Sequence, residues 1–407
     1  MNTKKKLFQG NIRQYTMLIA LVLIILFFQM ATNGKLLLPM NVSNIIFQNS
    51  YVVILAVGML LCIVGSANID LSVGSVVALV GATAGELIIT RGMNPYLSII
   101  ICLIISVLIG MWQGFWIANI RIPAFIVTLS SMLVFRGLTL LILNGLTLSP
   151  FPKEYLQFST GFLPDIGNGI VLFGEELNLT AMLIGVATAI IYAFSVIFTN
   201  AQKRRKGYET ESTLGSLIKV LVIGAVVIYL FYILACHRGV PTVLVILAII
   251  LLVYSYFTTN TVMGRHIYAM GGNEKAARLS GVKTKKLLFL SYVNMGFLSG
   301  VAGLVFAARL NSASPQAGAG FELDAIGACY IGGASAYGGI GTVGGTLIGA
   351  LIMGLLNNGM SIMGINSNMQ QVVKGLVLLA AVAFDVISKM QIDWKFWRKK
   401  SSTAVKA

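Results

Sequence analysis

Apolar runs long enough to cross a lipid bilayer follow one another along almost the whole chain. A hydrocarbon core of about 30 Å needs about 20 helical residues, and backbone groups in lipid must be satisfied within the helix itself. Twelve candidate runs occur, near 15–31, 45–65, 71–90, 97–118, 123–143, 181–199, 215–235, 240–258, 286–309, 321–336, 343–361 and 368–388. The sequence therefore predicts an all-α polytopic membrane protein with about 10–12 transmembrane helices, forming a single transmembrane domain over residues 1–407.

The basic residues indicate orientation rather than a nucleic-acid surface. The formal net charge is +16, but Lys and Arg fall between the apolar runs instead of along one soluble face. With twelve spans and the N-terminus inside, 21 of the 29 Lys and Arg residues lie on the cytoplasmic side. This distribution follows the positive-inside rule and places both termini in the cytoplasm. Run 321–336 is the weakest span, and a re-entrant hairpin there would put the C-terminal tail outside.

The segment 264–286 is a polar, basic island, and we expect it to form a cytoplasmic loop that carries a short surface helix. Asn273 can cap the helix, Glu274 complements the helix dipole in the first turn, and Gly281 stands where a left-handed C-terminal cap is expected. Its other side chains are small, apolar or charged: Lys275, Ala276, Ala277, Arg278 and Leu279. Such a helix suits docking into a groove on a soluble partner. An ordinary positive cytoplasmic loop is the alternative.

Two other loops are long enough to matter. The extracytoplasmic loop 144–180 carries four carboxylates against one lysine. Loops of this length are usually functional or disordered, so it is either a docking surface or a solvated spacer. The charged stretch within 200–214 is expected to be a flexible cytoplasmic connector.

Polar residues inside or beside the spans are candidates for the translocation pathway, because ionisable groups in a membrane usually face the protein interior or water. The turn between the second and third spans holds four of them, and the other four lie in or beside later spans. The candidates are Asn68, Asp70, Ser72, Ser75, Glu86, Asp324, Gln370 and Lys374. Asp70 has an equally good alternative role as a helix cap to residue 72 or 73.

Small residues recur at helical spacing in two places. The first stripe is Gly74, Ala78, Gly81 and Gly85, and the second is Gly341, Gly345 and Gly349. Stripes of this kind let neighbouring helices approach closely. Gly-interrupted segments in both halves of a transporter also favour broken helices around a central pathway.

Several functions lack their motifs. No Walker sequence is present, so ATP binding of that kind is excluded, and no residue set resembles a catalytic cluster. Neither histidine has a partner at zinc-site spacing, and the four cysteines are widely separated. We therefore expect neither an enzyme nor a metal site nor a cofactor in this chain.

Three stretches together resemble one family. They are NIDLSVGS near Asp70, GRHIYAMGGNEKAARLSGVKTKK from Gly264, and ARLNSASPQAGAGFELDAIGACYIGGASAYGGIGTVGGTLIGALIMGLLNNGM from Ala308. They are similar to the permeases of bacterial monosaccharide ABC importers, which include ribose, xylose and galactoside permeases. The resemblance covers roughly residues 40–145 and 260–388, and the extra spans in 146–258 look more like the xylose or multiple-sugar type.

This resemblance implies a permease in the bacterial cytoplasmic membrane that works by alternating access. A second permease copy, two copies of an ATPase that binds ATP and Mg, and a soluble extracytoplasmic sugar-binding protein would be its partners. The matching positions for contact with the ATPase are Gly272, Asn273, Glu274, Ala276, Ala277, Arg278 and Gly281. The main alternative is a twelve-span proton-coupled secondary sugar transporter, although the family motif expected between its second and third spans is replaced here by GSANIDLSVGS.

Overall fold

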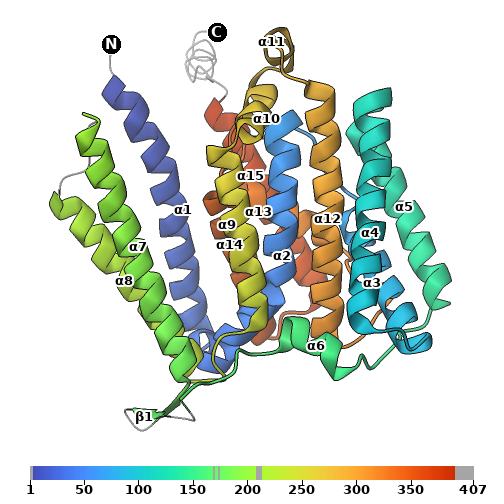
Figure 1. Cartoon of the computed structure of the whole chain (residues 1–407), viewed down its shortest axis with the longest axis horizontal. Coiled ribbons are helices and arrows are strands. Elements are labelled where there is room, and N and C mark those ends of the chain that lie inside the picture. Colours follow the sequence, from blue (N-terminus) through green and yellow to red (C-terminus); the bar gives the residue numbers. More distant parts are fainter. Residues whose placement is uncertain (1–2, 168–169, 173–174, 208–212, 390–407) are drawn as a thin grey trace, which may run out of the picture.

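The computed structural model describes residues 3–167, 170–172, 175–207 and 213–389, and it is a bundle of long helices (Figure 1). The first half contains α1 (Thr3–Ala31), α2 (Pro39–Ser66), α3 (Val73–Gly85), α4 (Pro95–Gly114), α5 (Ala124–Leu143) and α6 (Lys153–Thr160). Short helical segments η1 (Lys35–Leu37), η2 (Glu86–Thr90) and η3 (Phe115–Ile120) adjoin them, the last two being π-helical turns that extend α3 and α4.

The second half begins after a two-stranded hairpin of β1 (Ile170–Leu172) and β2 (Glu175–Leu177). The helices that follow are α7 (Leu179–Arg205), α8 (Thr213–Ala235), α9 (Thr242–Asn260), α10 (Val262–Gly272), α11 (Glu274–Leu279), α12 (Thr284–Leu310), α13 (Phe321–Ile331), α14 (Val343–Ile362) and α15 (Ser367–Lys389). Within the described residues, ten helices are long and apolar enough to span a membrane, and α1 adds a shorter apolar stretch over Thr16–Ala31.

Helix α2 forms the centre of the bundle. Its apolar stretch is 83% buried, whereas that of the peripheral α15 is 6% buried, so α2 is surrounded by other helices and α15 lies at the edge of the bundle. The core packs α2 against α12, α13 and α14 through residues such as Ile54, Met295 and Ala325. Small residues permit the close approaches: a Cβ at Gly349 would stand 2.0 Å from the Ala328 carbonyl oxygen on α13. The second glycine stripe therefore packs α14 on α13, as expected.

The expected span at 321–336 is corrected by the structure. Its helix, α13, has 11 residues and is about 16 Å long, roughly half the thickness of a membrane core. The segment from Ala313 to Gly339 nevertheless crosses the bundle. Ala313 pairs with Leu148 at one side, and Gly339 donates to the Val64 carbonyl, near the end of α2, at the other. Nonhelical backbone inside a membrane is tolerated where protein buries it.

The crossing keeps the start of α1, the end of α15 and α11 on one side of the bundle, at the top of Figure 1. We call this the α11 side. The opposite side carries α6 and the β-hairpin. Loop 144–180 is therefore partly structured: Tyr155 of α6 is fully buried, and its hydroxyl donates to the Leu304 carbonyl at 2.9 Å. The stretch 200–214 is less of a connector than expected, since 200–205 continue α7 and α8 begins at 213, while 208–212 lie outside the described residues.

Candidate functional site

The surface loop on the α11 side contains two short helices meeting at Asn273. The Asn273 side chain accepts a hydrogen bond from the Ala276 backbone N–H at 3.0 Å and so caps α11, as the sequence predicts. Gly281 follows the helix with a φ of +86°, the left-handed conformation that glycine adopts without strain. Helix α11 itself has six residues.

An ion pair fixes α11 to the turn before α5. Arg121 Nη2 lies 2.9 Å from Glu274 Oε1, and both side chains remain partly exposed. Burial alone would raise the pKa of Glu274, but the hydrogen bond and positive charge of Arg121, with smaller contributions from Thr284 and Arg278, lower this pKa below its usual value. Glu274 is therefore held in its charged form, and α11 is tied to a second surface element.

The two faces of α11 differ sharply. Ala277 is buried and packs with Val282 in the main hydrophobic core, so it anchors the helix instead of presenting a contact surface. Leu279, in contrast, is 88% exposed. The remaining expected contact residues are exposed at Gly272, Asn273, Glu274, Ala276, Arg278 and Gly281. Only Ala277 among the expected docking positions faces inward.

The chain enters the bundle between α2 and α3. The Asp70 backbone N–H lies 3.4 Å from Met59 Sδ, and Met59 is seven residues, or about 10 Å along the axis, before the end of α2. Asp70 Oδ1 accepts hydrogen bonds from the Ser72 N–H at 2.9 Å and from the Ser72 hydroxyl at 2.7 Å. The expected bond from Asp70 to the residue 72 N–H is present, but the N-cap residue of α3 is Ser72, so Asp70 holds the turn before the helix.

The hydrogen bonds between Asp70 and Ser72 extend to Gln113 of α4. Gln113 Nε2 donates to Ser72 Oγ at 2.6 Å, and all three side chains are buried. Four more buried polar atoms in this described part of the protein lack a protein partner: Ser75 Oγ, Gln113 Oε1, Tyr292 Oη and Ser299 Oγ. Buried polar groups are usually hydrogen-bonded, so the unpartnered ones on α3, α4 and α12 leave free hydrogen-bonding groups inside the bundle.

Two nonhelical stretches interrupt the helices inside the bundle: the turn between α2 and α3, which contains Asp70, and the stretch before α13. These two interruptions are in contact. A Cβ built at Gly74 would lie 2.1 Å from the Gly318 carbonyl oxygen, so the start of α3 touches backbone that runs toward α13. Arg136 of α5 supports this stretch of backbone by donating to the carbonyls of Pro315 at 2.8 Å and Ala317 at 2.7 Å. Two interrupted crossings thus meet inside the bundle, an arrangement that transporters use around a central pathway.

A buried ion pair lies at the start of α13. Lys374 Nζ of α15 stands 2.9 Å from Asp324 Oδ1, and the Tyr51 hydroxyl of α2 donates to Asp324 Oδ2 at 2.9 Å. The Asp324 side chain is 1% exposed and that of Lys374 20%. The ring of Tyr51 stacks on Phe321 with centroids 3.7 Å apart. Three helices are therefore connected through one carboxylate.

The other pathway candidates are scattered. Glu86 pairs with Arg91 on the partly exposed π-helical end of α3, at 3.0 Å. Gln370 donates to the Ile365 carbonyl at 2.8 Å near the start of α15, and Asn68 is half-buried in the turn after α2. Asp70, Ser72 and Ser75 gather at one interruption, and Asp324 with Lys374 at the other.

Sequence reasoning missed several polar residues at these interruptions. Gln113, Arg136 and Tyr51 each lie in a long apolar run, and their partners, from 41 to 273 residues away, give no local signal. Tyr292 lies in such a run as well, and its buried hydroxyl has no protein partner. The presence of Arg136 and Gln113 within a span was the one available sign, since strongly polar side chains there usually face protein.

Comparison with known proteins agrees with this arrangement. Residues 41–382 match the family described as branched-chain amino acid transport system / permease component. The chain belongs to this family. No solved structure gives a significant match.

Several curated relatives are similar over most of the chain. The xylose transport system permease protein XylH of Haemophilus influenzae is 38% identical over 95% of this chain and 100% of its own length, and XylH of Escherichia coli K12 is 38% identical over 93% of each. The ribose import permease protein RbsC of Escherichia coli K12 is 37% identical over 85% of each. The resemblance to monosaccharide ABC permeases is thus confirmed, and the family match favours it over a secondary transporter.

Proposed function

We propose that this chain moves a monosaccharide, xylose in the first place, across the bacterial cytoplasmic membrane as the permease subunit of an ATP-driven importer. The observation that carries the proposal is the match to xylose permeases along 93–95% of the chain, which includes the extra hairpin α7–α8. Ribose is the second cargo to test, because identity to the ribose permease is nearly as high but covers 85%.

The α11 side faces the cytoplasm in this proposal, as the positive-inside rule favours. A separate ATPase, which binds ATP and Mg, docks on α11 there, and a soluble sugar-binding protein delivers cargo to the α6 side. A second copy of the chain completes the permease. Leu279 supports the docking role, because an 88% exposed leucine at a helix tip gains free energy only when a partner covers it.

Docking can be tested at Leu279. Burying a leucine side chain is worth about 1.5–3 kcal/mol, so Leu279→Ser should weaken ATPase binding roughly 10- to 100-fold. Met30→Ser is the matched control, because Met30 is 79% exposed and lies at the end of α1 that is far from α11. Affinity is measured between the purified permease in nanodiscs and the ATPase subunit of the same importer. Equal affinities for the Leu279 variant and wild type would contradict docking at α11.

The proposed sugar pathway runs where the turn before α3 contacts the nonhelical stretch before α13. Buried, unpartnered hydroxyl and amide groups at Ser75, Gln113 and Tyr292 support this role, because a polyol needs several weak donors and acceptors along its route. Asp70→Asn should lower uptake and sugar-stimulated ATP hydrolysis together, since Asp70 holds Ser72 at the start of α3. Full activity of that variant would leave the region with a packing role alone.

Cargo and energy source are tested in proteoliposomes that contain the chain, its ATPase and its binding protein. Labelled xylose should accumulate only with ATP inside the compartment that holds the ATPase, and collapsing the proton gradient at constant ATP should change uptake little. Faster saturable uptake of ribose than xylose would reassign the cargo. Accumulation by the chain alone on an imposed pH gradient would instead support the secondary-transporter alternative.

A further inference from the structure

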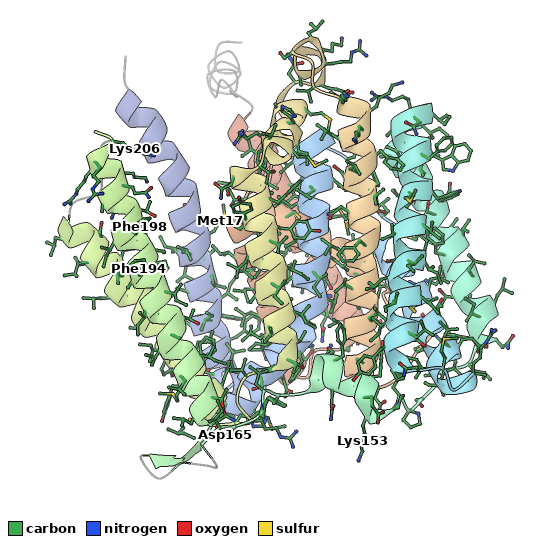
Figure 2. All side chains as sticks on the ribbon, in the orientation of Figure 1. Met17, Lys153, Asp165, Phe194, Phe198 and Lys206 are labelled. Atoms are coloured by element: carbon green, nitrogen blue, oxygen red, sulfur yellow. The ribbon has the colours of Figure 1, made fainter. Side chains whose placement is uncertain are left out.

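The hairpin of α7 and α8 is attached to the bundle mainly at one end. Its anchoring residues, among them Leu177, Ala181 and Leu234, are buried on the α6 side. Over their apolar stretches both helices are only 11% buried, and Figure 1 shows them standing apart from α2 toward the α11 side. Large side chains such as Phe194 and Phe198, each more than half exposed, follow α7 toward Lys206 (Figure 2). This end of the hairpin offers its surface to the membrane.

A groove with a volume of about 500 Å³ opens between the two helices on the α11 side. Its walls are apolar and include Ile197 of α7 and Leu217 and Val220 of α8. Polar side chains come together at Asn200, Arg204 and Ser216. Asn200 Nδ2 donates to Ser216 Oγ at 2.8 Å, and the Ser216 hydroxyl keeps its own hydrogen for donation.

The polar part of the groove lies at the depth of lipid headgroups. Helix α7 has 27 residues and is about 40 Å long, some 10 Å more than a hydrocarbon core, so its last two turns leave the acyl region. Those turns carry Lys203, Arg204 and Arg205, and Lys206 follows directly. Cations at this position attract anionic lipids, and basic pockets between transmembrane helices bind anionic headgroups.

We propose that the groove between α7 and α8 binds one anionic phospholipid. The phosphate accepts hydrogen bonds from Arg204 and Ser216, and an acyl chain lies along the apolar wall formed by Ile197, Leu217 and Val220. Charge complementarity selects an anionic headgroup over a zwitterionic one, and the apolar wall at membrane depth selects a lipid over free phosphate. The bound lipid fills the open end of a hairpin that protein contacts hold only at its other end.

The test uses the full-length chain in mild detergent and native mass spectrometry with added phosphatidylglycerol, phosphatidylethanolamine of the same acyl chains, or inorganic phosphate. Phosphatidylglycerol should bind more tightly than the other two. Because a hydrogen bond to a charged group contributes about 1.5–3 kcal/mol, Arg204→Gln should lower phosphatidylglycerol affinity roughly tenfold or more. Lys203→Gln is the matched control: it removes the same charge one residue away, outside the groove lining, and should lower affinity clearly less than Arg204→Gln does.

A second variant tests the groove by volume. Ala201→Phe places a ring in the groove lining and should lower the affinity for both phospholipids, with the thermal unfolding temperature unchanged because Ala201 is exposed. Equal losses for Arg204→Gln and Lys203→Gln would overturn the proposal in favour of diffuse attraction to the basic run. Equal affinity for both lipids would overturn the proposal as well. An Ala201→Phe variant that loses a permease dimer while keeping lipid would also overturn it, and would assign the groove to a second copy.

Discussion

Removal of the Lys374 charge is the sharpest test of the tertiary structure. Lys374→Met keeps the length and apolar stem of the side chain and deletes the ammonium group that lies 2.9 Å from Asp324. The carboxylate would keep one described hydrogen bond, from the Tyr51 hydroxyl. An ionised carboxylate with 1% exposure would then lose its counter-charge.

The expected cost follows from burial. Breaking a fully buried ion pair by removing one partner costs about 3–5 kcal/mol, and the 20% exposure of Lys374 places this site below that range, at about 2–3 kcal/mol. The double variant Asp324→Asn with Lys374→Met should recover to within about 1 kcal/mol of wild type, because the amide introduced at position 324 is neutral and its oxygen still accepts from Tyr51.

The free energy of unfolding is measured by reversible denaturation of the purified chain in mixed micelles with increasing sodium dodecyl sulfate. Lys153→Met is the control: Lys153 is exposed at the start of α6, and its replacement should change stability by less than about 0.5 kcal/mol. The reasoning is refuted if the single Lys374 variant is as stable as the double variant, since the two charges would then not depend on one another.

Three further predictions test other parts of the structure. Gly74→Ala should abolish uptake and destabilise the chain, because its Cβ would lie 2.1 Å from the Gly318 backbone oxygen, which cannot move aside. Gly137→Ala has open space around it and should stabilise α5 by up to about 1 kcal/mol. Thermal unfolding and uptake assays of both variants check these outcomes. Because the pKa of Glu274 is lowered in the folded chain, its exposed ion pair with Arg121 contributes stability above the unfolded pKa of about 4.3 and loses it as pH falls through the lower folded value. The small difference in unfolding temperature between wild type and Glu274→Gln should therefore be present at pH 7 and shrink as pH falls below about 4, and a difference that grows toward acid pH would contradict the assignment.

Local chemistry predicted several elements well. The cap at Asn273 and the left-handed Gly281 depend on residues close to each other in the chain, so the local sequence was enough to predict where α11 begins and ends. The apolar runs predicted the spanning helices for the same reason, because a helix in lipid satisfies its own backbone. The docking and pathway roles of these residues stay predictions.

Long-range contacts decided the rest. Tyr51 and Asp324, 273 residues apart, form one hydrogen bond, and nothing near either residue in the sequence indicates the other. The same holds for Ala277: its burial could not be read from a short polar stretch, because the core beneath α11 comes from other helices.

The clearest difference between sequence and structure is the crossing at α13. By itself the sequence determined that 321–336 is apolar, and the distribution of basic residues favoured a crossing there over a re-entrant hairpin. Only the tertiary structure decided that half of this crossing is nonhelical. The physical reason is that Gly74 and Arg136 supply close contact and hydrogen bonds to backbone at 315–318, so protein replaces the internal hydrogen bonds that a helix exposed to lipid would need.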